Sequence, residues 1–285
     1  MIRLDAATVL LQWAVGVMFF CWFTTRRREV GLGYGWLLRS TGALLAVGAA
    51  IVGFRFTMVA TRETASIGVA AASTAALVVS VALRHAGVRG QRLEHDRRTA
   101  RVAAMTGIER DERDTEQRAG REFPPVLDLV PVALGSVGLV AAAIDAGGAG
   151  AVSLVRTFAG AAFMGAVTDA MLLGHWYLVQ PGLPRRLLNE IVTAVAWVWP
   201  IEVVALLLPT GMFSVWSGSV DDGWGGMLGW IWGTCAVTTI ALVFVTRAAL
   251  REREYSAVMA ATGLLYLAIL TAFGTDLVAR AVLDG

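Results

Sequence analysis

The sequence predicts an all-α membrane protein, a polytopic helix bundle of about eight transmembrane helices with both termini outside the cytoplasm (N-out/C-out). Hydrophobic residues make up 56% of the 285-residue chain and charged residues only 16%, which is unlike a soluble domain of this length. Several stretches of about 20 residues are nearly free of charge, and a helix of that length crosses about 30 Å of hydrocarbon. The arginines, finally, gather in alternate links between these stretches.

Apolar runs set the expected helices, and the whole chain, residues 1–285, is expected to be one membrane domain. Three arginines follow the first run and no small-residue cleavage site appears, so we expect a membrane helix there and not a cleavable signal peptide. Small residues four apart, such as Ala161 and Gly165, favour close helix packing. The expected helices cover approximately residues 6–23, 34–54, 65–84, 125–146, 152–179, 186–208, 226–247 and 255–276.

The distribution of arginine predicts the direction of these helices. Short cytoplasmic loops carry the excess of arginine in membrane proteins. With the N-terminus outside, every arginine cluster falls on the cytoplasmic side. The clusters lie in residues 26–28, 84–123, 185–186 and 247–253. The outside segments then hold only Arg3, Arg55, Arg62 and Arg280. Adding or removing one helix would put a cluster on the wrong side.

One long hydrophilic segment, residues 84–123, divides the chain into two halves of four helices that share no matched motif. The segment mixes both charge signs, as in residues 109–114. Such a mixture is typical of a solvent-exposed helix or a disordered loop. We therefore expect a cytoplasmic charged loop or surface hairpin, and we expect it to dock other protein subunits.

Composition restricts the setting and the partners. The chain contains no lysine and is rich in Ala, Val and Gly, which suggests a bacterium with GC-rich DNA and hence the bacterial cytoplasmic membrane. The net charge of +2 is small and gives no signal for nucleic-acid binding. Membrane lipids and other subunits are the expected partners. Cys21 and Cys235 lie in apolar runs and are interpreted as small buried side chains.

Ionisable groups inside membrane helices are costly, so they are candidate site residues by default. Asp169 and Glu202 lie within expected helices, and Pro200 can kink the helix that carries Glu202. These two carboxyls are candidates for a proton or ion path; the alternative is a pair of protonated carboxyls with a purely structural role. Asp128 is a further buried candidate. Charged residues near expected helix ends are set aside because they can reach water or headgroups; they are Arg39, Arg156, Glu190 and Asp276.

A second candidate site is the junction of the fifth and sixth expected helices on the cytoplasmic side. His175, Trp176 and Tyr177 lie near the end of the fifth helix, and Glu190 lies in the first turns of the sixth. Antiparallel helices joined by a short link are neighbours, so these groups are expected close together. They can hydrogen-bond the head group of menaquinone or ubiquinone and move its protons, supply a haem ligand, or form a structural interfacial cluster.

A haem b would be ligated by histidine, and the chain has three histidines. His95 lies in the hydrophilic segment. His85 and His175 lie at the cytoplasmic ends of two helices that run in the same direction, so ligation by both is geometrically allowed. No other metal motif is expected. Asp169 and His175 are six residues apart, about 240° around a helix, so they do not form one dyad.

Three functions follow from these candidates. The first, which we expect, is the membrane subunit of a bacterial respiratory or redox complex that handles quinol or haem b. The second is a proton-coupled transporter or permease that uses Asp169 and Glu202. The third is a non-catalytic scaffold or assembly factor. A phosphate-binding loop, a dinucleotide fingerprint, a metalloprotease motif and a nucleophile elbow are all absent from the sequence, so no enzyme class is predicted.

Overall fold

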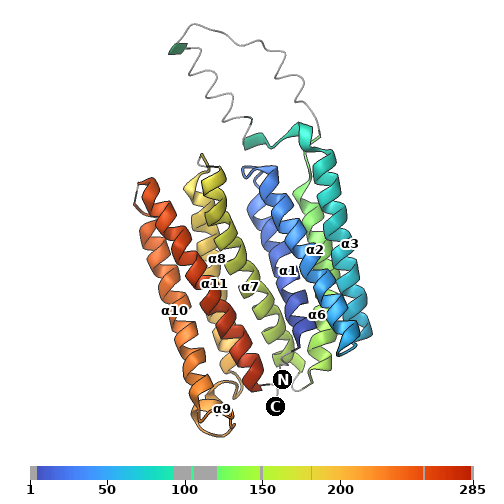
Figure 1. The fold of residues 1–285 in the computed structure, drawn as a ribbon, viewed down its shortest axis with the longest axis vertical. Helices are drawn as coiled ribbons and strands as arrows, with labels where there is room; N and C mark the ends of the chain where they lie inside the picture. The colour runs from blue at the N-terminus through green and yellow to red at the C-terminus, as the bar shows by residue number, and fades with distance from the viewer. Residues whose placement is uncertain are drawn as a thin grey trace.

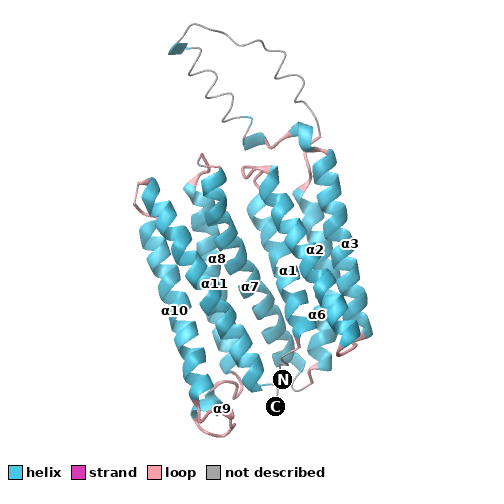
Figure 2. Ribbon diagram, viewed as in Figure 1, coloured by secondary structure: helices cyan, strands magenta, loops and turns pink. Residues whose placement is uncertain are grey.

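The protein is a bundle of long, nearly upright helices. The computed structural model describes residues 5–90, 92, 104–105, 121–147, 150–180, 182–252 and 254–283. Within these residues eight helical segments are long and apolar enough to span a membrane, as predicted, and all described structure is helix or loop (Figure 1 and Figure 2). The long helices are α1 (Ala6–Thr25), α2 (Leu32–Arg55), α3 (Ala60–Ala82), α6 (Leu129–Asp145), α7 (Gly150–Val179), α8 (Arg185–Leu207), α10 (Met227–Ala249) and α11 (Tyr255–Leu283). Short helical turns are η1 (Arg84–Ala86), η2 (Pro125–Asp128) and α9 (Phe213–Trp216).

The long helices form two groups of four. In the first group, α1, α2, α3 and α6 pack in a ring in that order, and α7, α8, α10 and α11 do the same in the second. Both rings begin at the end of the bundle that carries the two chain termini (Figure 1). The two groups therefore have the same order of helices and the same starting direction, although no sequence motif relates them. We call the end that carries the two chain termini the terminal end. The opposite end, with the α1–α2, α7–α8 and α10–α11 links, is the loop end.

The two groups join mainly where α1 packs against α7. Glycines bring the two backbones into contact there. An ideal Cβ on Gly16 would lie 2.0 Å from the carbonyl oxygen of Ala161, and one on Gly165 would lie 2.2 Å from the carbonyl carbon of Gly16. Phe163 and Met164 are fully buried beside this crossing. The small residues thus allow a close, dry contact in the middle of the bundle.

One helix begins earlier than predicted. α3 begins at Ala60 and not near residue 65, so Arg62 and Glu63 belong to its first turns and not to an exposed link. Glu63 accepts a hydrogen bond from the backbone N–H of Val59 at 3.1 Å, which satisfies one of the donors that a helix N-terminus leaves free. The prediction for the charged segment 84–123 falls largely outside the described residues.

Candidate functional site

Asp169 of α7 lies in a buried site against α1 and α2, which we call the Asp169 site (Thr24, Tyr34 and Asp169). Its side chain is 0% exposed. Oδ1 accepts a hydrogen bond from the Tyr34 hydroxyl at 2.5 Å, and Oδ2 accepts one from the Thr24 hydroxyl. Hydroxyl groups can donate to a carboxylate or accept from a carboxylic acid. The site can therefore hold Asp169 with or without its proton.

The Asp169 site contains no basic side chain. None of the ion pairs formed among the described residues involves Asp169. A carboxylate that is removed from water without a cationic partner carries a large desolvation cost, which binding of a proton or another cation relieves. This environment distinguishes Asp169 from the paired carboxylates elsewhere in the bundle.

A buried ion pair lies between α2 and η2, and its carboxylate contacts Cys21 of α1. Nε and Nη2 of Arg39 each lie 2.7 Å from an oxygen of Asp128, and Nη1 donates to Ser80 at 3.2 Å. Such a bidentate pair is among the stronger charge-assisted contacts. The expectation that Arg39 reaches water or headgroups is wrong: its side chain is 2% exposed, because Asp128 and Ser80 satisfy its guanidinium inside the bundle.

Cys21 connects this ion pair to the Asp169 site. Its sulfur lies 3.8 Å from Oδ2 of Asp128. Cys21 is also three residues before Thr24 on α1, so the two side chains share a face of the helix. A fully buried thiol thus lies beside Asp128 and one helical turn before the Thr24 hydroxyl that bonds to Asp169.

A buried cluster at the terminal end joins α1, α7 and α11. Nε of Arg280 donates to Asp276 at 2.6 Å, and its Nη2 donates to the Gln12 side-chain oxygen at 2.6 Å. The Gln12 amide in turn donates to the Thr157 carbonyl at 2.5 Å. Asp276 was expected near water or headgroups; it is fully buried because Arg280, one helical turn away, neutralises it.

Glu202 of α8 belongs to the same cluster, which we call the Glu202 cluster (Gln12, Arg156, Glu202, Asp276 and Arg280). It interacts electrostatically with Asp276, Arg280 and Arg156. Both of its oxygens are buried without a hydrogen-bond partner among the described residues. Arg156, also expected near headgroups, is buried and donates instead to the last carbonyls of α8, those of Ala205 and Leu208, at 2.9 and 2.6 Å.

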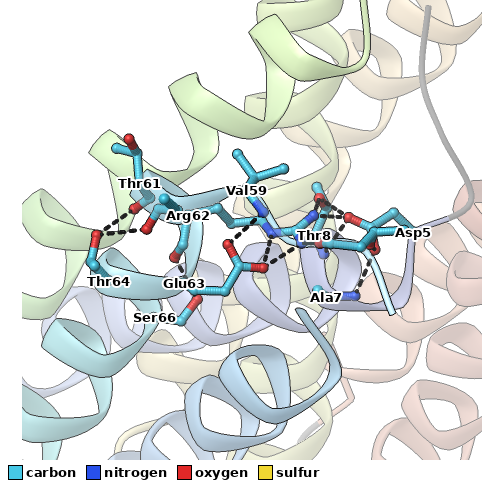
Figure 3. Close-up of polar contacts among 11 residues, drawn as sticks. Asp5, Ala7, Thr8, Val59, Thr61, Arg62, Glu63, Thr64 and Ser66 are labelled. Atoms are coloured by element: carbon cyan, nitrogen blue, oxygen red, sulfur yellow. Dashed lines mark hydrogen bonds and ion pairs between the residues drawn. The ribbon is translucent and has the colours of Figure 1, made fainter. Parts of the chain in front are cut away.

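A further ion-pair cluster ties the start of α1 to the start of α3 (Figure 3). Arg62 pairs with both Asp5 and Glu63, and it donates to the Thr8 hydroxyl at 3.1 Å. Asp5 also caps α1, accepting the backbone N–H of Ala7 at 3.2 Å. Arg62 was counted with the exposed outside segments, and so was Arg280; both are buried because carboxylates of the bundle enclose them.

A small polar hollow of about 10 Å³ lies between these two clusters at the terminal end, with Asp5, Thr8, Asp145, Thr157 and Arg280 in its lining. That volume is about the space of one water molecule. The hollow therefore has room for about one water molecule at the edge of the Glu202 cluster.

The junction of α7 and α8 lies at the loop end, and several of its polar groups have partners within the protein. Trp176 donates to the Gln180 side chain at 3.2 Å, and the Tyr177 hydroxyl donates to the Pro184 carbonyl at 2.7 Å. Glu190 forms an ion pair with Arg27 at 2.7 Å. The first two contacts fix the end of α7 and the α7–α8 link, and the Arg27–Glu190 pair joins the start of α8 to the α1–α2 link.

The two candidate haem ligands occupy different parts of the bundle. His175 is exposed on α7, with Nδ1 3.2 Å from the Tyr266 hydroxyl of α11. His85 is exposed in η1, at the end of α3. α3 packs chiefly against α2 and α6, whereas α7 packs chiefly against α1, α8 and α11. Asp169 and His175 do lie on different faces of α7, since one is buried and the other exposed.

Comparison with known proteins adds no assignment to these sites. No protein-family model, no curated protein and no solved structure matches the chain. Within the described residues, no group of three or more His, Cys, Asp or Glu side chains is arranged to hold a metal ion.

Proposed function

We propose that the protein is a proton-coupled membrane transporter in which Asp169 binds and releases the proton. The observation that carries this proposal is the Asp169 site, a fully buried carboxyl held by the hydroxyls of Tyr34 and Thr24 and by no arginine. Intramembrane carboxyls of this kind mark proton relays. Because both hydroxyl groups can reverse their hydrogen bonds, the site keeps its partners when the proton enters or leaves.

Glu202 serves the half of the path nearer the terminal end. Its two unpartnered oxygens can accept a proton from water that reaches Arg280 through the terminal-end hollow. Gln12 of the Glu202 cluster and Thr24 of the Asp169 site both lie on α1. Their separation along the helix is about 18 Å at 1.5 Å per residue. The glycine crossing of α1 and α7 lies between them. A proton can therefore pass from one polar half to the other only when the α1–α7 contact changes, so flux through the protein is slower than through an open pore.

The orientation that we propose places the loop end in the cytoplasm. The terminal-end arginines Arg62, Arg156 and Arg280 are buried, which leaves Arg55 as the exposed arginine among the described residues of that end. At the loop end, by contrast, the links are rich in arginine, as cytoplasmic links are. We place the protein in a bacterial cytoplasmic membrane, with segment 84–123 available to cytoplasmic partner subunits.

A redox subunit that handles quinol is a second candidate, favoured by one observation. The His175–Tyr266 pair is exposed on the surface of α7 and α11, and a quinone head group arriving from lipid could exchange hydrogen bonds with it. A haem bound by two histidines does not enter this proposal, because His85 and His175 lie on helices with different neighbours.

Proton flux into proteoliposomes tests the transporter. The full-length protein is reconstituted with an internal pH dye, and a potassium gradient with valinomycin supplies the driving voltage. We expect the unmodified protein to acidify the lumen and Asp169→Asn to abolish this flux, because an amide cannot carry the proton. Asp221→Asn is the matched control, since it makes the same substitution on an exposed loop residue.

Two results would contradict the transporter. One is the absence of voltage-driven flux through the unmodified protein, and the other is equal flux through Asp169→Asn and Asp221→Asn. The same preparation tests the redox candidate. A bound quinone in its lipid extract that disappears in His175→Ala would favour the quinol subunit, and an absorbance spectrum would show any haem.

A further inference from the structure

The loop end carries a second hollow, which lies between the start of α2 and the residues just before η2 and has a mainly apolar lining. Its volume is about 30 Å³, and Thr25, Gly31, Gly35, Arg39, Glu122 and Phe123 lie in its lining. A water molecule needs about 10–15 Å³, so the hollow has room for water, whereas the Arg39 side chain at its edge is only 2% exposed. Thr25 and Gly35 directly follow Thr24 and Tyr34 in sequence, so the hollow lies within one residue of the Asp169 site along both α1 and α2.

One aromatic side chain closes the hollow over Arg39. The Phe123 ring lies over the guanidinium, with its centroid 4.1 Å from Cζ. Phe123 is itself buried. An aromatic face that covers a guanidinium attracts it and also removes it from water. Phe123 thus caps the polar interior at the point where the hollow meets the ion pair.

An ion-pair cluster fixes the backbone next to this cap. Glu122 pairs with Arg28 of the α1–α2 link at 3.0 Å and also with Arg92. Arg92 lies near the beginning of the charged segment 84–123 and Glu122 lies near its end, so the two ends of that segment meet here. All three side chains are at least partly exposed, so their mutual attraction is modest and sensitive to salt. The cap is therefore held by contacts that solvent or a partner can compete for.

Beyond Phe123, polar groups lead from Arg39 toward the Asp169 site. Arg39 bonds to Asp128, and Asp128 contacts the Cys21 sulfur. Thr24, three residues after Cys21 on the same face of α1, bonds to Asp169. Each of these groups can orient a water molecule or pass a hydrogen bond along. Water admitted at Arg39 would thus reach the proton-binding carboxyl along one chain of side chains.

We propose that Phe123, held in place by Glu122, is the loop-end gate of the proton path to Asp169. The role of the path rests on the proton-coupled function proposed above, whereas the gate itself is a statement about water access. Displacement of Phe123 lets water reach Arg39, Asp128 and Cys21, and its return makes this half of the path dry again. Binding of a partner at Glu122 would be one way to displace it.

Hydroxyl-radical footprinting of the full-length protein in lipid nanodiscs tests the gate. The radicals form from water in place, so the oxidation rate of Cys21, read by mass spectrometry, reports water inside the path. We expect Phe123→Ala to raise this rate roughly 2- to 30-fold, the range that the strength of an aromatic–guanidinium contact implies. Glu122→Gln, which weakens the hold of Arg28 and Arg92, is expected to raise it as well.

Matched controls distinguish a gate at Phe123 from a general loss of helix packing. Phe123→Tyr keeps the ring over Arg39 and should leave the rate unchanged. Phe56→Ala removes an exposed phenylalanine at the opposite end of α2 and should also leave it unchanged. Phe123→Leu keeps most of the apolar volume without the aromatic face, and it provides the measurement if Phe123→Ala does not purify as a monodisperse protein.

The gate and the transporter can fail separately. The gate is overturned, whatever the proton flux, if Phe123→Ala and Phe123→Leu show the same Cys21 oxidation rate as Phe56→Ala. That holds both when none of these variants raises the rate and when all of them raise it equally. Cys21 oxidation that rises only in Phe123→Ala or Phe123→Leu supports the gate even if no flux depends on Asp169, in which case the transporter alone fails. If flux depends on Asp169, it should be faster in Phe123→Ala, and flux that is slower or unchanged there would also overturn the gate.

Discussion

Adding a single methyl group at the α1–α7 crossing should separate the two helix groups. In Gly16→Ala the new Cβ would lie 2.0 Å from the Ala161 carbonyl oxygen, about 1 Å short of the 3.0 Å that real Cβ atoms keep. The obstacle is backbone, so no side-chain rotation relieves it and the helices must move apart. Overpacking of this kind costs about 1–3 kcal/mol. It outweighs the gain of up to about 1 kcal/mol that alanine has over glycine within a helix.

Gly263 of α11 is the matched control, because a Cβ there has no neighbour within 4 Å among the described residues. Gly263→Ala should therefore leave the free energy of unfolding unchanged or raise it slightly, whereas Gly16→Ala should lower it by up to about 2 kcal/mol, the overpacking cost less the gain of alanine over glycine. Unfolding of both variants in mixed micelles with increasing denaturing detergent, followed by tryptophan fluorescence, measures the difference. If Gly16→Ala is as stable as Gly263→Ala, the close contact of α1 and α7 is not as described.

Two further substitutions test the buried ion pair and the α8–α10 link. Asp128→Ala should lower the free energy of unfolding by about 3–5 kcal/mol because Arg39 is left buried without its partner; adding Arg39→Met should restore part of the loss, and an additive double mutant would count against a direct pair. The backbone N–H of Gly226, with those of two neighbours, holds the pKa of Asp222 below its usual value. A lowered folded-state pKa stabilises the link at neutral pH, and that stabilisation is lost as the pH falls through this pKa. Amide exchange in the link should therefore quicken only in acid, with no such step in Asp222→Asn.

Helix existence and number were predictable because apolar length is a strong signal in a membrane chain. α10, for example, is predicted from its own continuous apolar run, without reference to any neighbouring helix. The start of α3 was not predictable in the same way. Arg62 and Glu63 have the composition of an exposed link, and their place inside the helix depends on Asp5, which is far away in sequence.

The candidate site was predictable only where it carries charge. Asp169 and Glu202 stand out in apolar runs, but Tyr34 and Thr24 do not, because a hydroxyl in such a run gives no signal until its acceptor is known. Asp276 was misjudged for a related reason. Its distance from the helix end suggested headgroups, whereas its environment is set by Arg280 and Gln12, and pairing between helices cannot be read from position along one helix.

The position of Asp169 also bears on how the chain assembles during synthesis. Chains emerge N-terminus first, so α1, α2, α3 and α6 can enclose one another before α7 is complete. The hydroxyls of Thr24 and Tyr34 then lie on the surface of that first group until the Asp169 carboxyl of α7 arrives as their acceptor. If α7 docked one turn out of register, Asp169 would meet lipid or apolar side chains, at a cost of about 2.5–3.5 kcal/mol on membrane-insertion scales. The same carboxyl that we assign to proton binding therefore helps the second half of the protein to dock in a single register.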